Sequence, residues 1–193
     1  MTMTQSVPQS IEQTLPDIDR AAHHAEGFLT ALGVDLGTPA RRESAMRMAK
    51  AYLEMMSRDP FEMTTFDNDE GYGELVLVTG IVVQSLCEHH FLPFTGVAHV
   101  GYLPGERLVG LSKLARTVEL HARGPQTQEN LTQQIAGHLV GSLAPRGVGV
   151  VIEAEHTCMS LRGVRASGTR TRTSAFTGAL RDPAARQEFL ASL

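Results

Sequence analysis

The chain has 193 residues and a net charge of −4, with 42% hydrophobic, 20% charged and 5% aromatic residues. This length is enough for one domain with a buried core and an N-terminal appendage. The weak negative charge does not support binding to nucleic acid, and no stretch reaches the roughly 20 apolar residues that span a bilayer. The polar N-terminus lacks a signal-peptide pattern, and two cysteines are too few for a disulfide scaffold. We therefore predict a cytoplasmic protein that binds neither nucleic acid nor a membrane.

The charge is divided unevenly along the chain. Residues 1–104 carry 6 basic and 14 acidic side chains, whereas residues 105–193 carry 11 basic and 7 acidic ones. Between Arg162 and Arg181 there are five arginines and no carboxylate. Runs of like charge usually form solvated surfaces, but this one also has the charge that a small anion requires. Charge alone leaves both interpretations open.

The first 73 residues predict an arm followed by helices. Residues 1–16 show no apolar periodicity and contain two prolines, so we interpret them as a mobile arm. From Asp17 to Leu32 apolar residues recur at steps of three and four, which predicts a helix that stops at Gly33. A second helix is predicted from about Arg42 to Ser57, and a loop over 58–73. We treat residues 17–73 as an N-terminal helical region.

Residues 74–193 are predicted to form the catalytic domain. Short β-branched runs predict strands over 75–78, 81–83, 97–102, 107–109, 148–156 and 170–176. Pro104 and Gly105 indicate a hairpin turn between the third and fourth of these runs. Two helices are inserted, with Ser112 and Thr127 at their starts, and a short helix begins at Pro183. This order predicts an α+β fold with a mainly antiparallel sheet of four main strands. Because open sheet edges must be covered or paired, we expect self-association.

Both cysteines lie close to histidines. Cys87 and His90 are three residues apart, a spacing that lets a thiolate and an imidazole from one turn meet the same metal ion. If 148–158 is a strand, its period of two places His156 and Cys158 on one face. Cys87, His90 and Cys158 would then bind Zn²⁺ and leave a position for water, with His89 and His156 as acid–base groups. A structural site closed by His89 or His156, a disulfide, or simple burial of the two cysteines stays open.

Two predicted helix starts carry side chains suited to a nucleotide. Ser112, Lys113 and Arg116 together form a credible phosphate cradle, although a solvated helix has the same pattern. Glu129, in the first turn of the next helix, complements the helix dipole. A carboxylate there could also accept hydrogen bonds from the adjacent N–H donors of guanine. The sequence contains neither a P-loop nor a dinucleotide fingerprint.

These features occur together, in order, in one family. The sequence closely resembles zinc-dependent GTP cyclohydrolase I over residues 17–193, most strongly from Glu74 onward. The matching segments are 85–94 (SLCEHHFLPF), 101–104 (GYLP), 110–116 (GLSKLAR), 126–129 (QTQE) and 147–163, which ends HTCMSLRG.

The resemblance implies hydrolysis of GTP to 7,8-dihydroneopterin triphosphate with release of formate, the first step of folate and pterin biosynthesis. It also implies the tunnelling fold, in which sheets from several subunits close an oligomeric barrel, assembled as a homodecamer with sites at subunit junctions. The implied roles in this chain are as follows: Cys87, His90 and Cys158 as zinc ligands; His156, His89 and Ser112 in catalysis; Glu129 and Gln128 at the guanine; Lys113, Arg116 and Arg162 at the triphosphate.

The chain also departs from the family pattern. The family usually carries Thr-Pro directly before a short helix that contains an arginine, whereas here residues 44–50 fill that place. Arg47 is the best match for this phosphate-side arginine. Arg172 stands where an apolar residue is common. A related enzyme acting on another purine or pterin, or a non-catalytic scaffold that binds zinc and nucleotide, is the alternative reading.

Overall fold

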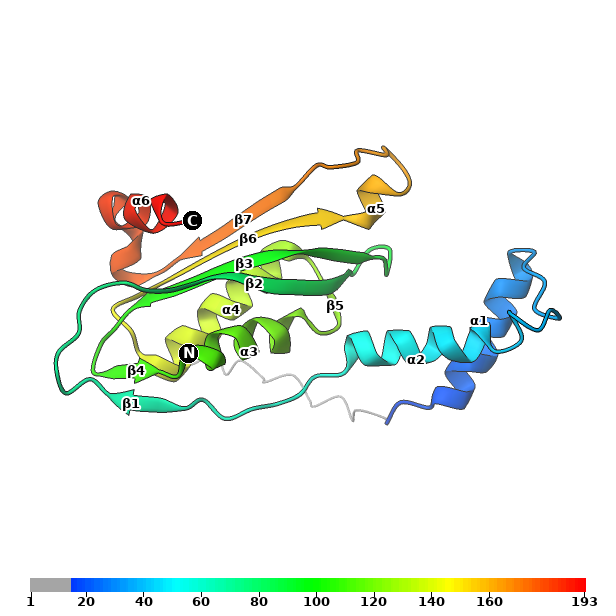
Figure 1. Cartoon of the computed structure of the whole chain (residues 1–193), viewed down its shortest axis with the longest axis horizontal. Helices are drawn as coiled ribbons and strands as arrows, with labels where there is room; N and C mark the ends of the chain where they lie inside the picture. Colours follow the sequence, from blue (N-terminus) through cyan, green and yellow to red (C-terminus); the bar gives the residue numbers. More distant parts are fainter. Residues whose placement is uncertain (1–14) are drawn as a thin grey trace, which may run out of the picture. The chain divides into compact units, whose positions relative to one another are not determined.

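The computed structural model describes residues 15–193, so nearly all of the predicted arm over 1–16 lies outside the described residues. The chain divides into two compact units, with the division between Glu54 and Met55. The second unit holds every strand of the described residues and both inserted helices (Figure 1).

The N-terminal unit contains the two predicted helices. Helix α1 spans Ile18–Ala31. The carboxylate of Asp17 accepts a hydrogen bond from the backbone N–H of Arg20 at 2.9 Å, which caps the helix. Beyond its end Gly33 adopts a φ of 80°, a left-handed conformation typical of a helix stop. Helix α2 spans Ser44–Met56, within the predicted limits.

The larger sheet of the second unit has five strands, and the prediction of four is wrong. Its order is β5-β2-β3-β6-β7, and all neighbours are antiparallel except β5, which runs parallel to β2. The bounds are β2 Val76–Cys87, β3 Pro93–Leu103, β5 Pro125–Gln126, β6 Gly147–His156 and β7 Thr171–Phe176. Strand β5 is only two residues long, too short for any periodic pattern. The mixed α+β class and the mainly antiparallel pairing are confirmed.

Two details of the predicted strands are corrected by the pairing. The runs 75–78 and 81–83 form one strand, because a bulge with Gly80 at a φ of 69° lets β2 continue. Strand β4, Arg107–Val109, does not form a hairpin with β3 but pairs with β1, Thr65–Asp67, in a separate two-stranded sheet. The amide of Asn68 donates to the carbonyl of Gly105 at 2.9 Å, which ties the two turns together.

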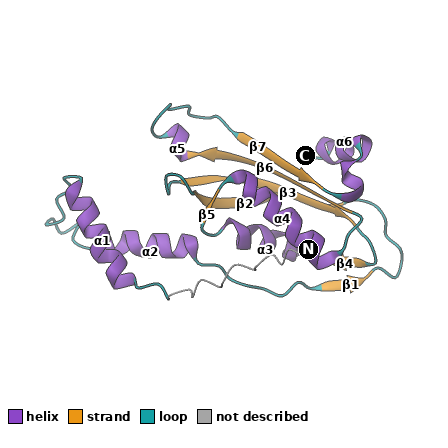
Figure 2. Cartoon of the chain, turned by 180° about the vertical axis from the view of Figure 1, so that it is seen from behind, coloured by secondary structure: helices purple, strands orange, loops and turns teal. Residues whose placement is uncertain are grey.

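Helices cover both faces of the larger sheet. Helices α3, Leu111–Ala122, and α4, Gln128–Leu143, pack their apolar sides against alternate residues of β2, β3 and β6 (Figures 1 and 2). A short 3₁₀ helix at Gly178–Arg181 and helix α6, Pro183–Ala191, lie against the opposite face, where Phe189 contacts Val151. Together these contacts leave the ends of β2, β3 and β6 nearest α5 free for the site.

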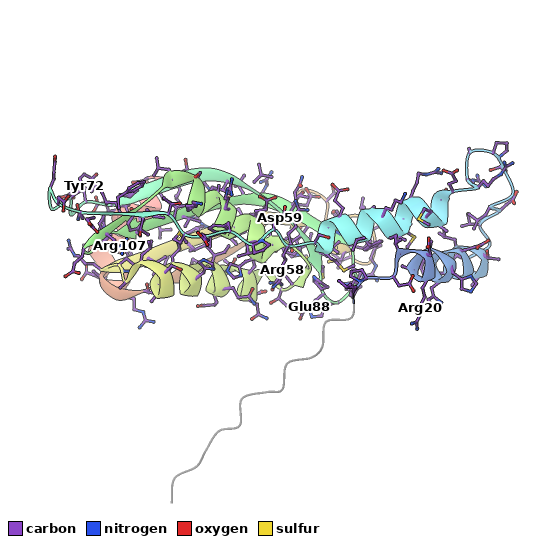
Figure 3. All side chains as sticks on the ribbon, turned by 90° about the horizontal axis from the view of Figure 1, so that it is seen from below. Arg20, Arg58, Asp59, Tyr72, Glu88 and Arg107 are labelled. Atoms are coloured by element: carbon purple, nitrogen blue, oxygen red, sulfur yellow. The ribbon has the colours of Figure 1, made fainter. Side chains whose placement is uncertain are left out.

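One of the two inserted helices begins where predicted and the other begins slightly earlier. The hydroxyl of Thr127 accepts from the backbone N–H of Asn130 at 3.2 Å, so the predicted start of α4 at Thr127 is confirmed, with this residue as the N-cap. The predicted start of α3 at Ser112 is corrected, because Gly110 is the N-cap and Ser112 lies inside the first turn. The extended segment after α2 is held to the end of α3, because Arg58, labelled in Figure 3, donates from Nε to the carbonyl of Arg123 at 3.1 Å.

Candidate active site and metal centre

A tight turn after β2 brings Cys87 and His90 together. The carbonyl of Cys87 accepts from the backbone N–H of Phe91 at 2.8 Å and from that of His90 at 3.3 Å. The N–H of Cys87 donates to the carbonyl of Leu92 at 2.8 Å, which closes the turn. Phe91 has a φ of 54°, an uncommon conformation for a residue with a side chain. The backbone therefore bends within four residues, so that both side chains can reach one ion.

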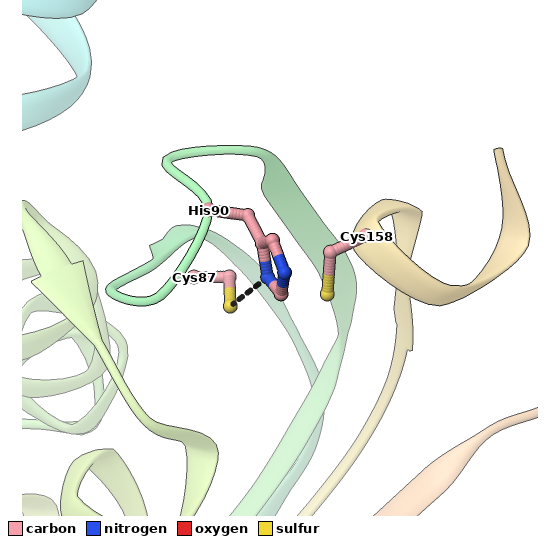
Figure 4. Close-up of side chains that lie close together, drawn as sticks. All are labelled: Cys87, His90 and Cys158. Carbon is pink, nitrogen blue, oxygen red and sulfur yellow. Dashed lines mark hydrogen bonds between the residues drawn. The ribbon is translucent and has the colours of Figure 1, made fainter. Parts of the chain in front are cut away.

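The second cysteine arrives from a helical turn and not from a strand. Strand β6 ends at His156, and Cys158 lies in the short helix α5, Thr157–Ser160. The predicted placement of His156 and Cys158 on one face of a single strand is therefore wrong, because the strand ends before Cys158. The hydroxyl of Thr157 donates to the carbonyl of Pro93, and the N–H of Leu161 donates to the carbonyl of Thr157. These bonds hold the chain in a turn that directs the thiol of Cys158 towards the Cys87 loop (Figure 4).

The three predicted metal ligands form one cluster. One donor atom each from Cys87, His90 and Cys158 lie within 4.8 Å of one another (Figure 4). His90 Nδ1 is 3.9 Å from Cys87 Sγ. Two sulfur ligands of tetrahedral zinc lie about 3.8 Å apart, given zinc–sulfur distances of about 2.3 Å. A small closure of the cluster would thus accommodate the ion, and two thiolates with one imidazole are donors that zinc prefers.

The cysteines are buried but not joined. Both are free thiols, so the disulfide alternative is not realised. Burial raises the pKa of the Cys158 thiol, and the neighbouring Cys87 adds to this rise. Coordination to zinc deprotonates a thiol outright. Metal binding at this cluster is therefore coupled to the release of protons.

His89 lies beside the cluster without joining it. Its Nδ1 is 3.8 Å from Cys87 Sγ, and its Nε2 is 3.9 Å from a carboxylate oxygen of Glu88. The ring is exposed to solvent. Within the described part of the chain, the ligand group contains three residues and not four. This geometry favours an open coordination position over a closed structural site.

His156 is held on two sides. Its ring stacks on Phe94, with centroids 4.5 Å apart and planes 13° apart, because the two residues are directly paired between β3 and β6. Its Nε2 lies 2.8 Å from Oε1 of Gln128. Burial lowers the pKa of His156, while the charge of Glu129 opposes that shift. The imidazole is therefore neutral near pH 7 and ready to accept a proton.

A cavity of about 310 Å³ joins these groups. Its lining residues are Cys87, His89, His90, Gln126, Thr127, Gln128, Glu129, His156, Cys158, Met159 and Thr171. Seven of the twelve site residues expected from the sequence thus meet in one place. Arg162 lies at its edge, with one guanidinium nitrogen 3.3 Å from His90 Nε2 and 3.4 Å from the carbonyl of Cys158.

Besides Arg162, four expected residues are not among those that line this cavity. Ser112 is exposed on α3, and the ammonium of Lys113 lies over the ring of Phe61 at 5.4 Å from its centroid. Arg116 lines a different cavity of about 320 Å³ between α3 and β2. Arg47, in the N-terminal unit, donates to the carbonyl of Ala40 at 2.9 Å.

Sequence reasoning missed several contacts of the site. Phe94 was not given a role, although its register opposite His156 could have indicated one. Met159 and Thr171 line the cavity, but nothing in their local pattern distinguishes them. The unusual Arg172 forms an ion pair with Glu153 at 3.3 Å across β6 and β7, so this departure from the family pattern has a local partner.

Comparison with known proteins gives the context for this geometry. The sequence model of one family, GTP cyclohydrolase I, matches residues 21–193. The chain belongs to the GTP cyclohydrolase I family. GTP cyclohydrolase 1 of Streptomyces avermitilis is 48% identical over 193 residues, which cover 96% of each chain. The enzyme of Streptomyces griseus subsp. griseus is 50% identical over 177 residues, 89% of this chain and 88% of that one.

A relative from a third organism gives the same result. GTP cyclohydrolase 1 of Aquifex aeolicus is 48% identical over 164 residues, which cover 84% of this chain and 89% of the relative. The family membership confirms the resemblance described from the motifs. Among the described residues of this family member, no helix has the length and apolar character needed to cross a membrane.

Proposed function

We propose that the chain is a zinc-dependent GTP cyclohydrolase I, which converts GTP to 7,8-dihydroneopterin triphosphate and formate. The observation that carries this proposal is the single cavity of about 310 Å³ in which the ligand cluster, His156 and Glu129 meet. Membership of the GTP cyclohydrolase I family supports the choice of reaction. Two free thiols support a reducing compartment, and we place the protein in the cytoplasm.

Cys87, His90 and Cys158 would hold the metal. When bound there, zinc would supply Lewis-acid activation of water, the chemistry that hydrolysis at C8 of guanine requires. The protein's own part is to present two buried sulfurs and one imidazole from two separate turns. The remaining side of the cluster faces the cavity and stays accessible to substrate.

Two histidines would move protons at the imidazole ring of the substrate. His156 lies in the cavity wall and is held neutral by burial, so it can take up a proton and return it. His89, exposed and beside Cys87, is the second acid–base group. Opening of the five-membered ring requires a proton at nitrogen as the bond to carbon breaks, and both histidines line the cavity that would hold this ring.

Glu129 would hold the guanine edge. It lies in the first turn of α4, is exposed and lines the cavity. One carboxylate can accept hydrogen bonds from two adjacent N–H donors, and guanine presents such a pair. This contact would orient the base so that C8 points towards the metal cluster.

The triphosphate clamp requires more than one copy of the chain. Arg162 lies at the cavity edge, whereas Ser112, Lys113 and Arg116 lie elsewhere on the same chain. We assign these three to the cavity of a neighbouring copy, in a homodecamer whose sheets form a barrel. In this assembly Ser112 contacts the ribose, and the two basic residues and Arg47 bind phosphate.

The outer edge of the sheet supports such an assembly. In the described residues β7 pairs with β6 alone and leaves its outer edge open. A strand of a neighbouring copy could pair with this edge. All residues that line the cavity lie within 74–193, which supports the assignment of the catalytic domain to that range. Helices α1 and α2 support the assignment of 17–73 to a mainly helical region.

One assay tests the proposed reaction. Purified protein is incubated with GTP, and formate and the oxidised, fluorescent pterin product are measured with and without a chelator. The proposal predicts one formate per pterin and loss of both products after zinc removal. If metal-replete protein releases neither product, the proposal is wrong, and retained GTP binding would then favour the non-catalytic scaffold.

A further inference from the structure

The side chain of Gln128 has its orientation fixed by the protein. Gln128 is 1% exposed, and its amide nitrogen lies 3.1 Å from the carbonyl of Ile152, 3.0 Å from that of Thr171 and 3.1 Å from Oγ1 of Thr173. Carbonyl oxygens only accept hydrogen bonds. The atom that faces them must therefore be the NH₂ group, and the amide cannot be turned over.

A chain of hydroxyl groups supports the same orientation. Thr132 donates from Oγ1 to the carbonyl of Gln128 at 2.7 Å. Its hydroxyl proton is thereby used, so in the 2.7 Å contact between the two threonine hydroxyls Thr173 is the donor. The Oγ1 of Thr173 is then free to accept from the amide of Gln128. The donor and acceptor assignments of these hydrogen bonds are therefore consistent with one another.

The fixed amide determines where His156 carries its proton. Because NH₂ faces the carbonyls, Oε1 of Gln128 is an acceptor, and it lies 2.8 Å from Nε2 of His156. The histidine must donate in this bond, so its Nε2 bears hydrogen. In a neutral imidazole the other ring nitrogen, Nδ1, then has the free lone pair. Stacking on Phe94 at 4.5 Å keeps the ring in its plane.

We propose that Gln128 is a positioning residue that acts through His156. It fixes the neutral imidazole in the tautomer with hydrogen on Nε2 and so makes Nδ1 the atom that exchanges a proton with the substrate. The amide donors of Gln128 all contact protein atoms, so recognition of guanine falls to Glu129 and not to this side chain. The inference rests on the proposed function, since it assigns an atom to the proton transfer of that reaction.

Kinetic constants of Gln128→Met test the assignment. Methionine is similar in length and volume but cannot accept the hydrogen bond from His156. Loss of such an orienting partner typically costs about 10- to 100-fold in activity. We expect kcat to fall by this amount, with KM for GTP changed less than about threefold, because only the orientation of His156 is lost. A rise in KM of about tenfold at unchanged kcat would overturn the proposal and return Gln128 to the guanine.

A measurement of GTP binding tests the role of Gln128 without relying on turnover. In the His156→Ala background we expect turnover to be slow, so that the dissociation constant of GTP can be measured directly. If Gln128 acts through His156, adding Gln128→Met leaves that constant unchanged and lowers any residual rate no further. A dissociation constant about tenfold weaker in the double variant would contradict the assignment.

Thr173→Val is the matched control for a purely structural role. It removes one partner of the same amide but leaves the contact between Gln128 and His156. We expect a lower unfolding temperature with kcat within about twofold of wild type. Equal losses of kcat in Thr173→Val and Gln128→Met would show that only local stability matters and would overturn the proposal.

Two further checks keep the outcomes separate. If Gln128→Met does not fold, Gln128→Leu also removes the acceptor opposite Nε2 and is expected to lose kcat by about the same 10- to 100-fold; a selective rise in its KM would contradict the proposal. The wild-type chain is assayed beside every variant. Absence of formate from wild type defeats the proposed function itself, whereas the patterns above decide only the role of Gln128.

Discussion

At the scale of single residues, the site separates three tasks among side chains of different chemistry. Two buried thiols and His90 meet where an ion can bind, His156 is kept neutral against an aromatic ring, and Glu129 is exposed to the cavity. The neutral state of His156 follows from burial, which outweighs the opposing charge of Glu129. The same carboxylate can therefore bind substrate without converting the neighbouring histidine to its charged form.

Glu129→Gln tests the role assigned to the carboxylate. Hydrogen bonds to a charged group contribute about 1.5–3 kcal/mol, so KM for GTP should rise by about 10- to 100-fold. Inosine triphosphate lacks the 2-amino donor of guanine. The preference for GTP over inosine triphosphate should therefore be smaller in the variant than in wild type. Glu188→Gln, an exposed carboxylate in α6, is the control and should leave both kinetic constants unchanged. An unchanged KM in Glu129→Gln would remove this residue from the guanine site.

At the scale of secondary structure, close strand contacts place the catalytic groups. Strands β3 and β6 pair over ten residues, and this register brings Phe94 under His156. The pairing has almost no tolerance at Gly96, where an added Cβ would lie 2.0 Å from the carbonyl of Glu153 and 2.6 Å from Cα of Ala154. The position of His156 at the end of β6 thus depends on the close approach of β6 to a glycine of the neighbouring strand β3.

Gly96→Ala is therefore expected to be strongly destabilising. Backbone must move to admit the methyl group, and we expect unfolding free energy to fall by about 3 kcal/mol or more. Gly137→Ala in α4 is the matched control, because nothing lies within 4 Å of its added Cβ. Its helix should gain about 0.5–1 kcal/mol. Denaturant unfolding at equal zinc content measures both changes, and a neutral Gly96→Ala would show that β3 and β6 are not held this closely.

A histidine pair between α3 and α4 predicts a dependence of stability on pH. His121 Nε2 lies 3.0 Å from His138 Nδ1, and burial, followed by His138 and Arg58, lowers the pKa of His121 below its usual 6.5. Below pH 6.5 the unfolded chain therefore binds a proton that the folded chain does not, so stability falls as pH falls in that window.

His121→Gln should weaken this dependence. Denaturant midpoints at about pH 7.5 and about pH 5.5 are compared between wild type and variant in metal-free protein, since zinc loss would add its own pH effect. Wild type should lose more stability on acidification than His121→Gln. Equal losses would assign the pH effect to other groups, such as His99 and His156, whose pKa values burial also lowers.

The sequence predicted elements with a clear period and missed those without one. The alternating and apolar runs of β2, β3, β6 and β7 were identified, as was the cap of α4 at Thr127. Strands β1 and β5 have three and two residues, and their pairing depends on distant segments. The helical turn at Cys158 follows from contacts of Thr157 with Pro93, 64 residues away. The cluster of Cys87, His90 and Cys158 was nevertheless predicted, because ligand chemistry is carried by residue type and spacing.

At the scale of the whole molecule, the residues proposed for the site form two separate groups. The proposed metal ligands, His156 and Glu129 line one cavity, while Lys113 and Arg116 lie outside it. This separation agrees with the division of charge along the chain, in which the basic C-terminal half supplies nearly all proposed phosphate ligands. The assembly proposed above would bring the two sets together across a junction between copies.

Mixed oligomers test this separation. Lys113→Ala and His156→Ala should each be inactive alone, because every junction then lacks one group. Random mixed assembly at equal amounts restores both groups at about one quarter of the junctions. We therefore expect co-expressed, co-purified chains to recover up to about one quarter of wild-type formate release. If mixed oligomers form but recover no activity, the two groups belong to the same chain's site.

The most direct test of the whole account is zinc content measured together with formate release in Cys158→Ala and His156→Ala. The account predicts that Cys158→Ala loses both zinc and turnover, because two ligands cannot retain the ion. His156→Ala should keep one zinc per chain and lose turnover, because this histidine moves protons and does not bind the metal. Stoichiometric zinc in Cys158→Ala, or loss of zinc from His156→Ala, would contradict the assigned metal centre.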